Sequence, residues 1–442
     1  MPERCCNHAT LWQNFPDTSL LHTTPLPADS LACAMLLSAH AVAAVISGKS
    51  LTEALAANAT ALPATRASAQ DMAYGALRRY GQGDAILASL LSRPLAMPEV
   101  RALLLCALLR LDRRPESTHT IVDQAVEAAG QLANGAFRGL VNGVLRNYLR
   151  QRDALLAKLS GDEAKYWHPS WWLRRLRETY PDRWQQIIEA GNNQPPMTLR
   201  VNQRRIGRDE YLKKLQDAGI EASPLGSVGI LLASPQPVDA LPGFFDGLAS
   251  VQDFGAQRAA ELLDVSDGQR VLDACAAPGG KAAHILELAS PSLLALEMDA
   301  GRSRRIGENL KRLQLDAEVR VADCRRVSKW WDGVPFDRIL ADVPCSASGV
   351  VRRHPDSKWL RRETDIHDFA VIQRQILGAL WPTLAPGGKL LYATCSVFPE
   401  ENGEQMALFM ASRPQAKLIS EEQLLPQGEH DGFYYALVQK TS

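Results

Sequence analysis

Apolar residues in the first third of the chain recur at the spacing of amphipathic helices. Leu103, Ala107 and Leu111 illustrate the pattern, with apolar positions three to four residues apart along one helix face. Prolines divide the region into segments. We predict a helical bundle over residues 31–160, in which the alanine-rich segment 31–46 is a buried helix.

A shorter polar stretch and a mixed region come next. Residues 168–190 are predicted as a helix pair, with tryptophans interleaved among arginines. Such tryptophans can stack on bases, but more often pack one domain against another, and we expect packing here. A double proline then precedes a strand at 197–202, a helix at 209–218 and a strand at 229–233. This small α+β module is locally basic, which suits either a polyanion or a solvated surface.

From residue 271 onward, short apolar runs alternate with helical stretches. After a first strand beginning at Val271, strand candidates lie at 292–298, 317–322, 336–341 and 389–393. Polar residues stand at or just after the ends of these later strands: Glu297, Asp323, Asp342 and the pair Thr394-Cys395. The alternation predicts a parallel sheet with a ligand above the carboxyl ends of its strands. A late run at 433–439 is expected to add an antiparallel strand at the sheet edge.

Composition narrows the class of protein. The chain has 442 residues, 22% of them charged, with a formal net charge of +0, so any affinity for a polyanion must come from local patches. No apolar run reaches the ~18 residues of a membrane helix. The 8 cysteines lack the spacing of a disulfide framework, which suggests a reducing compartment. We therefore expect a cytoplasmic, monomeric protein of several domains without membrane or metal partners. Residues 1–30 are expected to form a flexible leader.

The stretch VLDACAAPGGK at 271–281 predicts a strand that enters a glycine-rich turn and then a helix. Such a turn exposes backbone N–H groups to a ligand. The spacing matches neither the G-x-G-x-x-G fingerprint of dinucleotide folds nor a phosphate-binding loop. With Glu297 available for a ribose and Asp323 on the next strand, S-adenosylmethionine is the ligand that fits.

Two cysteines follow neighbouring strands, Cys345 after the fourth and Cys395 after the fifth. Both thiols should therefore face one pocket. A thiolate suits methylation of a pyrimidine at C5, because addition of sulfur to C6 makes the unreactive C5 nucleophilic. Asp342 is expected to donate a proton or hydrogen bond to the ring at N3. The competing interpretation is a pair of buried core cysteines. A disulfide is disfavoured by the lack of a secretory signal. A zinc site is disfavoured because neither cysteine lies in a C-x-x-C pair or near a histidine at ligand spacing.

Three motifs together resemble the RNA cytosine-5 methyltransferases: CAAPGGK at 275–281, DVPCSASG at 342–349 and YATCS at 392–396. Within that family the chain is similar to the bacterial small-subunit rRNA enzymes of the RsmB, Sun or Fmu type. The resemblance implies that Cys395 is the nucleophile and that Cys345 helps to release the product. It also implies S-adenosylmethionine contacts, from Cys275, Ala276, Ala277, Pro278, Gly279, Gly280, Lys281, Glu297, Asp323 and Asp342. Asp299 competes with Glu297 for the ribose.

Residues 137–149 resemble the last helices of the antitermination factor NusB, an RNA-binding fold, and three nearby arginines could face phosphate: Arg138, Arg146 and Arg150. The resemblance thus implies an N-terminal all-α NusB-like bundle (31–160), linker helices with a small α+β module (161–248), and a Rossmann-like class I methyltransferase domain with a mostly parallel seven-stranded sheet (249–442).

The expected partner is small-subunit rRNA. Four basic residues after Cys345 are predicted to grip RNA at the mouth of the pocket: Arg352, Arg353, Lys358 and Arg361. Trp359, between them, could stack on a base. Two other functions remain open, a tRNA cytosine-5 methyltransferase and a non-catalytic RNA-binding assembly factor.

Overall fold

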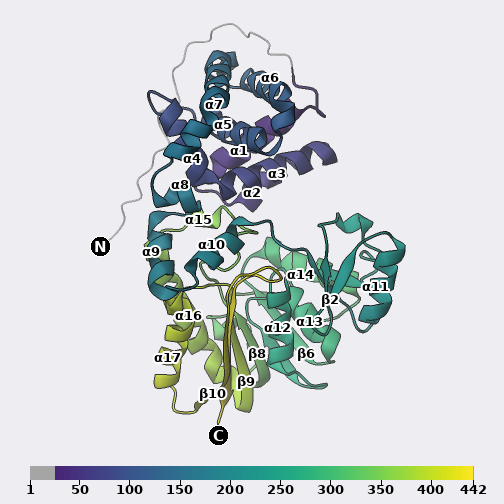
Figure 1. Cartoon of the computed structure of the whole chain (residues 1–442). Coiled ribbons are helices and arrows are strands. Elements are labelled where there is room, and N and C mark those ends of the chain that lie inside the picture. Colours follow the sequence, from purple (N-terminus) through teal and green to yellow (C-terminus); the bar gives the residue numbers. More distant parts are fainter. Residues whose placement is uncertain (1–24, 442) are drawn as a thin grey trace.

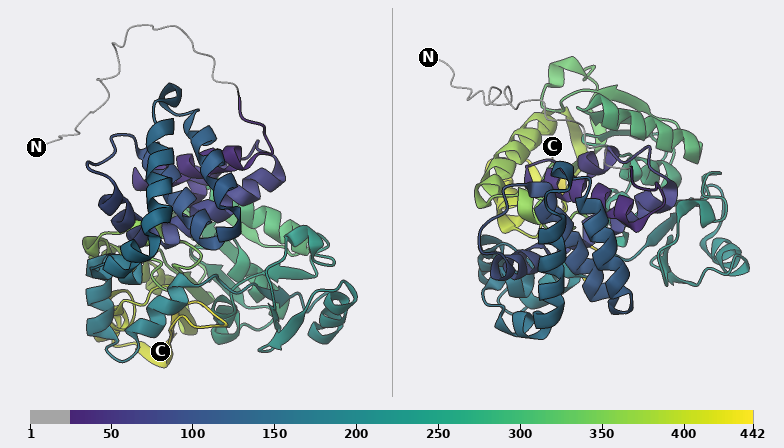
Figure 2. Two further views of the ribbon diagram at one scale, coloured as in Figure 1. Left: turned by 45° about the horizontal axis from the view of Figure 1, so that its top comes forward. Right: turned by 90° about the horizontal axis from the view of Figure 1, so that it is seen from above.

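The computed structural model describes residues 25–441, so most of the expected leader, residues 1–24, lies outside the described part. A helical bundle sits on one end of a larger sheet domain, and a small module carrying α11 (Arg208–Asp217) projects to the side (Figure 1). The two further views in Figure 2 show the same three parts from above and from an oblique angle. None of the described helices is long and apolar enough to cross a membrane.

The bundle confirms the helical prediction for the first third of the chain. Ser30 caps its first helix, with Oγ accepting from the main-chain nitrogen of Cys33 at 3.1 Å. That helix is the predicted buried one, and it packs against α3, α5 and α6. The bundle helices are α1 (Leu31–Ile46), α2 (Leu51–Ala56), α3 (Pro63–Arg78), α4 (Tyr80–Leu90), α5 (Pro98–Arg113), α6 (Thr118–Ala129) and α7 (Arg138–Lys158).

Linker helices and a four-stranded antiparallel sheet follow. The helices are α8 (Asp162–Tyr166), α9 (Ser170–Thr179) and α10 (Trp184–Asn192). The sheet has the order β2-β3-β1-β4, with α11 (Arg208–Asp217) between β1 and β2 in sequence. Its strands are β1 (Thr198–Val201), β2 (Ala222–Leu225), β3 (Gly229–Leu232) and β4 (Ala249–Val251). The sequence predicted β1, α11 and β3. It missed β2, an edge strand that contains Pro224 and lacks an apolar face.

The second sheet has seven strands in the order β10-β11-β9-β8-β5-β6-β7, as expected for the last domain. Strands β9, β8, β5, β6 and β7 are parallel, and β11 runs antiparallel between β9 and β10. Residues 433–439 form the predicted antiparallel strand, but its predicted place at the edge of the sheet is wrong. The edge is β10, whose exposed, charged sequence hides its strand character. The strands are β5 (Arg270–Asp273), β6 (Ser292–Glu297), β7 (Glu318–Val321), β8 (Phe336–Asp342), β9 (Leu384–Thr394), β10 (Ala416–Leu424) and β11 (Phe433–Lys440).

Helices cover both faces of this sheet (Figure 1). Central strands are buried on both sides, as Val271, Leu272 and Leu340 show, which is typical of parallel sheets. The chain order reverses between β5 and β8, because β6 and β7 lie on one side of β5 and β8 and β9 on the other. Ligands in such folds bind at this reversal, beyond the carboxyl ends of the strands. The helices are α12 (Phe254–Leu263), α13 (Gly280–Leu288), α14 (Ala300–Leu313), α15 (Ser357–Leu360), α16 (Glu363–Leu380) and α17 (Gly403–Ala411).

The tryptophans of the linker pack between parts of the chain, as predicted. Trp172 is buried, with its ring centroid 5.3 Å from that of Phe398 in the segment after β9. Leu173 and Leu176 share this apolar cluster with Val351 of the sheet domain. The linker is thus held to the sheet domain by a core of its own.

Candidate active site

The loop after β5 turns tightly against its neighbours. Gly279 has a φ of +96°, in the left-handed region, and a Cβ at this position would lie 3.1 Å from Ile306 of α14. The main-chain nitrogen of Ala276 donates to the oxygen of Leu296 on β6 at 2.8 Å. The loop is thereby fixed between β6 and α14, and its end opens α13 with free main-chain N–H groups.

A cavity of about 270 Å³ lies beside this loop at the carboxyl ends of the parallel strands. Its wall combines apolar side chains such as Ile372 and Ile376 with polar ones from every parallel strand end. Seven residues of the predicted site line it: Cys275, Ala277, Glu297, Asp323, Asp342, Cys345 and Cys395. The remaining loop residues of the predicted cofactor site are not among those that line this cavity: Ala276, Pro278, Gly279, Gly280 and Lys281.

The two predicted cysteines are neighbours. Sγ of Cys345 and Sγ of Cys395 lie 3.3 Å apart, because parallel β8 and β9 deliver them side by side. The nitrogen of Gly349 donates to the main-chain oxygen of Cys395 at 2.8 Å, which ties the two loops together. The hydrogen bond with the Cys395 sulfur, followed by burial, raises the pKa of Cys345 well above its ordinary value. The raised pKa favours the protonated thiol form of Cys345.

The carboxylates around the cavity have different partners. Glu297 is buried and faces the cavity, and its Oε1 accepts from the nitrogen of Asp299 at 3.0 Å. Asp299, its rival in the sequence, instead caps α14 by accepting from the nitrogen of Arg302 at 2.7 Å. Hydrogen bonds from Arg325 lower the pKa of Asp323. Asp342 Oδ2 accepts from Lys281 Nζ at 2.5 Å. Of these two acids, Glu297 presents its carboxylate to the cavity, whereas Asp299 serves the helix.

Comparison with known proteins places this geometry in a family. The family described as 16S rRNA methyltransferase RsmB/F matches residues 260–439, an RsmF/B-like ferredoxin-like domain matches 168–239, and the NusB family matches 31–150. The ribosomal RNA small subunit methyltransferase B of Cronobacter sakazakii is 45% identical over 388 residues, covering 85% of this chain and 90% of that protein. The protein of that name from Vibrio vulnificus is 46% identical over 409 residues, covering 89% and 96%. The chain belongs to the RsmB/F family of 16S rRNA methyltransferases.

A solved structure shares the architecture. The crystal structure of PH0851 superposes with a TM-score of 0.78 at 22% identity, covering 94% of this chain and all of that one. At this identity the likeness concerns the fold alone. It extends over the bundle, the linker and the sheet domain together.

The cofactor of this methyltransferase family is S-adenosylmethionine, and the residues present fit it. Asp273, at the end of β5, is 1% exposed, and neither of its carboxylate oxygens accepts a hydrogen bond from another side chain. It directly precedes the cavity-lining residues Ala274 and Cys275. A buried carboxyl without a side-chain partner, beside a cavity that the carboxylate of Glu297 also lines, suits a cofactor that carries an ammonium group and a ribose.

Two residues of this site were missed from the sequence. Asp273 ends the first parallel strand and could have been found by the same rule as the other strand-end acids. Cys324, which follows Asp323, lines the cavity with its Sγ 4.0 Å from that of Cys275. Its sequence gives no comparable signal, because only folding brings it close to the loop after β5.

The prediction that the basic residues after Cys345 contact RNA is wrong for Arg352 and Lys358. Arg352 is 2% exposed and pairs with buried Asp431. Lys358 is fully buried and donates to the main-chain oxygens of Arg78 at 3.0 Å and Trp167 at 2.8 Å. These side chains satisfy groups inside the protein, so their charges are not available to phosphate.

The other two predicted RNA-binding residues, Arg353 and Arg361, also have partners within the protein. Arg353 lies between Asp431 and Asp253, and Arg361 donates from Nε to the main-chain oxygen of Ser346 at 3.3 Å. Trp359 donates from Nε1 to the oxygen of Leu77 at 2.8 Å and packs on the bundle rather than facing a base. The acids and carbonyl groups that bind these basic side chains are remote in sequence. The sequence of this segment alone therefore resembles an exposed basic loop.

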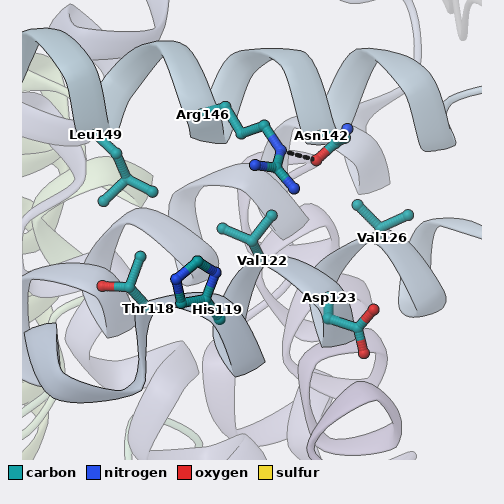
Figure 3. Close-up of a pocket in the computed structure, with 8 residues that line it drawn as sticks. All are labelled: Thr118, His119, Val122, Asp123, Val126, Asn142, Arg146 and Leu149. Carbon is teal, nitrogen blue, oxygen red and sulfur yellow. Dashed lines mark hydrogen bonds between the residues drawn. The ribbon is translucent and has the colours of Figure 1, made fainter.

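A second cavity, of about 290 Å³, lies between α6 and α7 of the bundle (Figure 3). Val122, Val126 and Leu149 line it together with polar residues, and exposed Arg146 donates from Nε to Asn142 Oδ1 at 2.8 Å. Its lining contains no cysteine, whereas both predicted catalytic cysteines line the cavity at the strand ends. The exposure of Arg146 keeps its predicted contact with phosphate open.

Proposed function

We propose that the protein methylates C5 of a cytosine in 16S rRNA, with Cys395 as the nucleophile that activates the ring. The observation that carries this proposal is the position of two thiols 3.3 Å apart on the wall of the candidate cofactor cavity. An amine nitrogen could accept a methyl group without any thiol, whereas C5 of a pyrimidine needs covalent activation. A pair of cysteines at this point therefore favours a carbon acceptor.

When bound, S-adenosylmethionine supplies the methyl group as an electrophilic carbon on its sulfonium sulfur. The Cys395 thiolate adds to C6 of the cytosine, and the electron pair of the 5,6 double bond makes C5 nucleophilic. C5 forms a bond to the methyl carbon while the bond from that carbon to the sulfonium sulfur breaks, and the sulfur leaves as a neutral thioether. A base then removes the C5 proton and the bond between Sγ and C6 breaks, which restores the double bond. The net change replaces the hydrogen on C5 by a methyl group.

Asp342 acts in the first step of this reaction, and Cys345 acts in the last. Asp342 lines the cavity and accepts from Lys281, and it is our candidate for the group that delivers a proton to N3 of the ring while Cys395 attacks. Cys345 retains its proton because its pKa is raised, and its sulfur lies within hydrogen-bonding distance of Cys395. Cys345 thus donates to the sulfur that leaves C6 and helps to release the product.

Other observations support the proposal that RNA is the substrate. The relatives that match most of the chain are named for the small ribosomal subunit, and the bundle matches the NusB family. Arg138, Arg146 and Arg150 are exposed on α7 and are our candidates for phosphate contacts in the bundle. The bundle sits directly on the segment after Cys345, so RNA held there lies close to the cavity.

Denaturing gel electrophoresis with 16S rRNA and S-adenosylmethionine tests the chemistry. Cys345→Ala should accumulate a protein–RNA adduct that survives denaturation, since release is slowed, whereas Cys395→Ala should form none. The reverse pattern would exchange the two roles. Absence of an adduct and of methylation in the unaltered protein would instead favour a non-catalytic RNA-binding factor. Bisulfite sequencing of rRNA from cells with and without the gene identifies the cytosine, and a modified tRNA cytosine would redirect the substrate.

A further inference from the structure

A buried carboxylate lies beneath the two cysteines. Glu401 is fully buried at the end of the short helical segment Pro399–Glu401. Its Oε1 accepts from the main-chain nitrogen of Ser346 at 2.8 Å and from Gln373 Nε2 at 3.2 Å. Its Oε2 accepts from the hydroxyls of Ser346 and Ser396, each at 2.5 Å. All four donors are uncharged.

The two serines are the residues that directly follow the cysteines. Ser346 follows Cys345 at the end of β8, and Ser396 follows Cys395 at the end of β9. Their hydroxyls also lie 3.2 Å from each other, and Ser348 Oγ lies 3.0 Å from both. One carboxylate therefore holds both cysteine-bearing loops at the residue next to each thiol.

An ionised carboxyl group can accept all four of these hydrogen bonds at once. A carboxylate accepts on both oxygens, whereas a glutamine amide offers one accepting oxygen and a donating nitrogen. Burial without a counter-ion is costly, and burial is the main reason that the pKa of Glu401 is raised. The hydrogen bonds from the serines and Gln373 act in the opposite direction and favour the charged form.

We propose that Glu401 is a positioning residue that sets the spacing of the two thiols through Ser346 and Ser396. The significance of that spacing for catalysis rests on the function proposed above, whereas the spacing itself does not. The negative charge of Glu401 also contributes to the raised pKa of Cys345, after the hydrogen bond with Cys395 and burial. Glu401 thus helps to keep the proton on the thiol that is to donate it.

Thiol cross-linking measures the spacing without any methyl transfer. A diazene oxidant such as diamide joins two thiols: both S–H bonds break, an S–S bond forms, and the two hydrogens reduce N=N to a hydrazine. The bond between Cys345 and Cys395 is followed by peptide mass spectrometry, which separates it from any bond between Cys275 and Cys324. In Glu401→Gln we expect its rate to fall about 10-fold, because the loops are no longer held together.

Tyr392→Phe is the matched control. The Tyr392 hydroxyl donates to the main-chain oxygen of Glu401 at 2.6 Å and lies 3.0 Å from Gln373 Oε1, but it does not touch the carboxylate or the serines. This variant should lose stability while cross-linking at the rate of the unaltered protein. If Glu401→Gln does not fold, Ser346→Ala and Ser396→Ala each remove one tether and should slow cross-linking individually.

Steady-state kinetics then separates positioning from general damage. For Glu401→Gln we expect kcat to fall about 10- to 100-fold, with the KM for S-adenosylmethionine unchanged within about 2-fold and a larger fraction of trapped RNA adduct. Cross-linking that is unaltered in Glu401→Gln overturns the proposal, as does slowing to the same degree in Tyr392→Phe. If cross-linking is slower in Glu401→Gln but the unaltered protein methylates no rRNA and Cys345→Ala forms no adduct, the positioning role stands and only the proposed function is refuted.

Discussion

Lys358 Nζ lies 3.0 Å from the main-chain oxygen of Arg78, although 280 positions separate the two residues in the chain. The lysine follows the cysteine loop of the sheet domain, and the arginine ends α3 of the bundle. Burial, followed by the charge of Arg78, lowers the pKa of Lys358 well below its ordinary value. The contact therefore works as a set of hydrogen bonds between domains rather than as a surface charge.

We predict that Lys358→Met weakens the attachment of the bundle. The change keeps the buried aliphatic stem but leaves the carbonyls of Arg78 and Trp167 without their donor, at a cost of about 1–3 kcal/mol. Calorimetry should show a lower Tm, and limited proteolysis should cleave the linker around residues 159–197 faster. Lys213→Met, on the exposed face of α11, is the control and should change neither. Equal protease resistance of both variants would contradict the assigned role.

Arg352 and Arg146 should separate structural from RNA-binding arginines. Arg352→Ala leaves the carboxylate of Asp431 buried with fewer partners, so we expect a loss of about 3–5 kcal/mol in the free energy of unfolding. Arg146→Ala removes an exposed charge and should leave stability within about 0.5 kcal/mol. It should instead weaken rRNA binding and reduce the slope of log affinity against log salt by about 1. Filter binding across a salt series checks this, and an unchanged slope would remove Arg146 from the interface.

The contrast between these arginines shows what the sequence could predict. The loop, the acids at the strand ends and both cysteines were found because each is tied to a strand end, and parallel strands bring their ends to one edge. Arg352 and Lys358 were misassigned because their partners, Asp431, Arg78 and Trp167, are remote in sequence. Glu401 escaped notice because a carboxylate in a polar stretch after Cys395 resembles an exposed one. Local pattern therefore identified the groups that line the cavity, whereas the groups that support them emerged only from tertiary contacts.

Lys281 and Asp342 should behave as one unit in catalysis. Their ion pair joins the loop after β5 to the end of β8, and both side chains are largely buried. Lys281→Met should lower kcat about 100-fold by releasing the carboxylate that is to hold the ring, and Asp342→Asn should do the same. The double variant should lose little more than either single variant. Lys389→Met, which breaks the pair with exposed Asp264, is the control and should retain full activity. Multiplicative losses in the double variant would show that the two residues act separately.

Asp273 makes stability depend on pH. Burial, followed by the negative charge of Asp342, raises its pKa from 3.8 to about 7. Between these values the folded protein holds a proton that the unfolded chain has lost, so the contribution of Asp273 favours folding least at high pH. Stability from this group is complete below about pH 4 and falls progressively up to about pH 7, by on the order of 4 kcal/mol. Asp273→Asn should remove this component, so its gain in Tm over the unaltered protein should be larger at pH 8 than at pH 5. Calorimetry at both values, without cofactor, measures the difference. A gain that is the same at both pH values would show that Asp273 is ionised in the folded protein throughout this range.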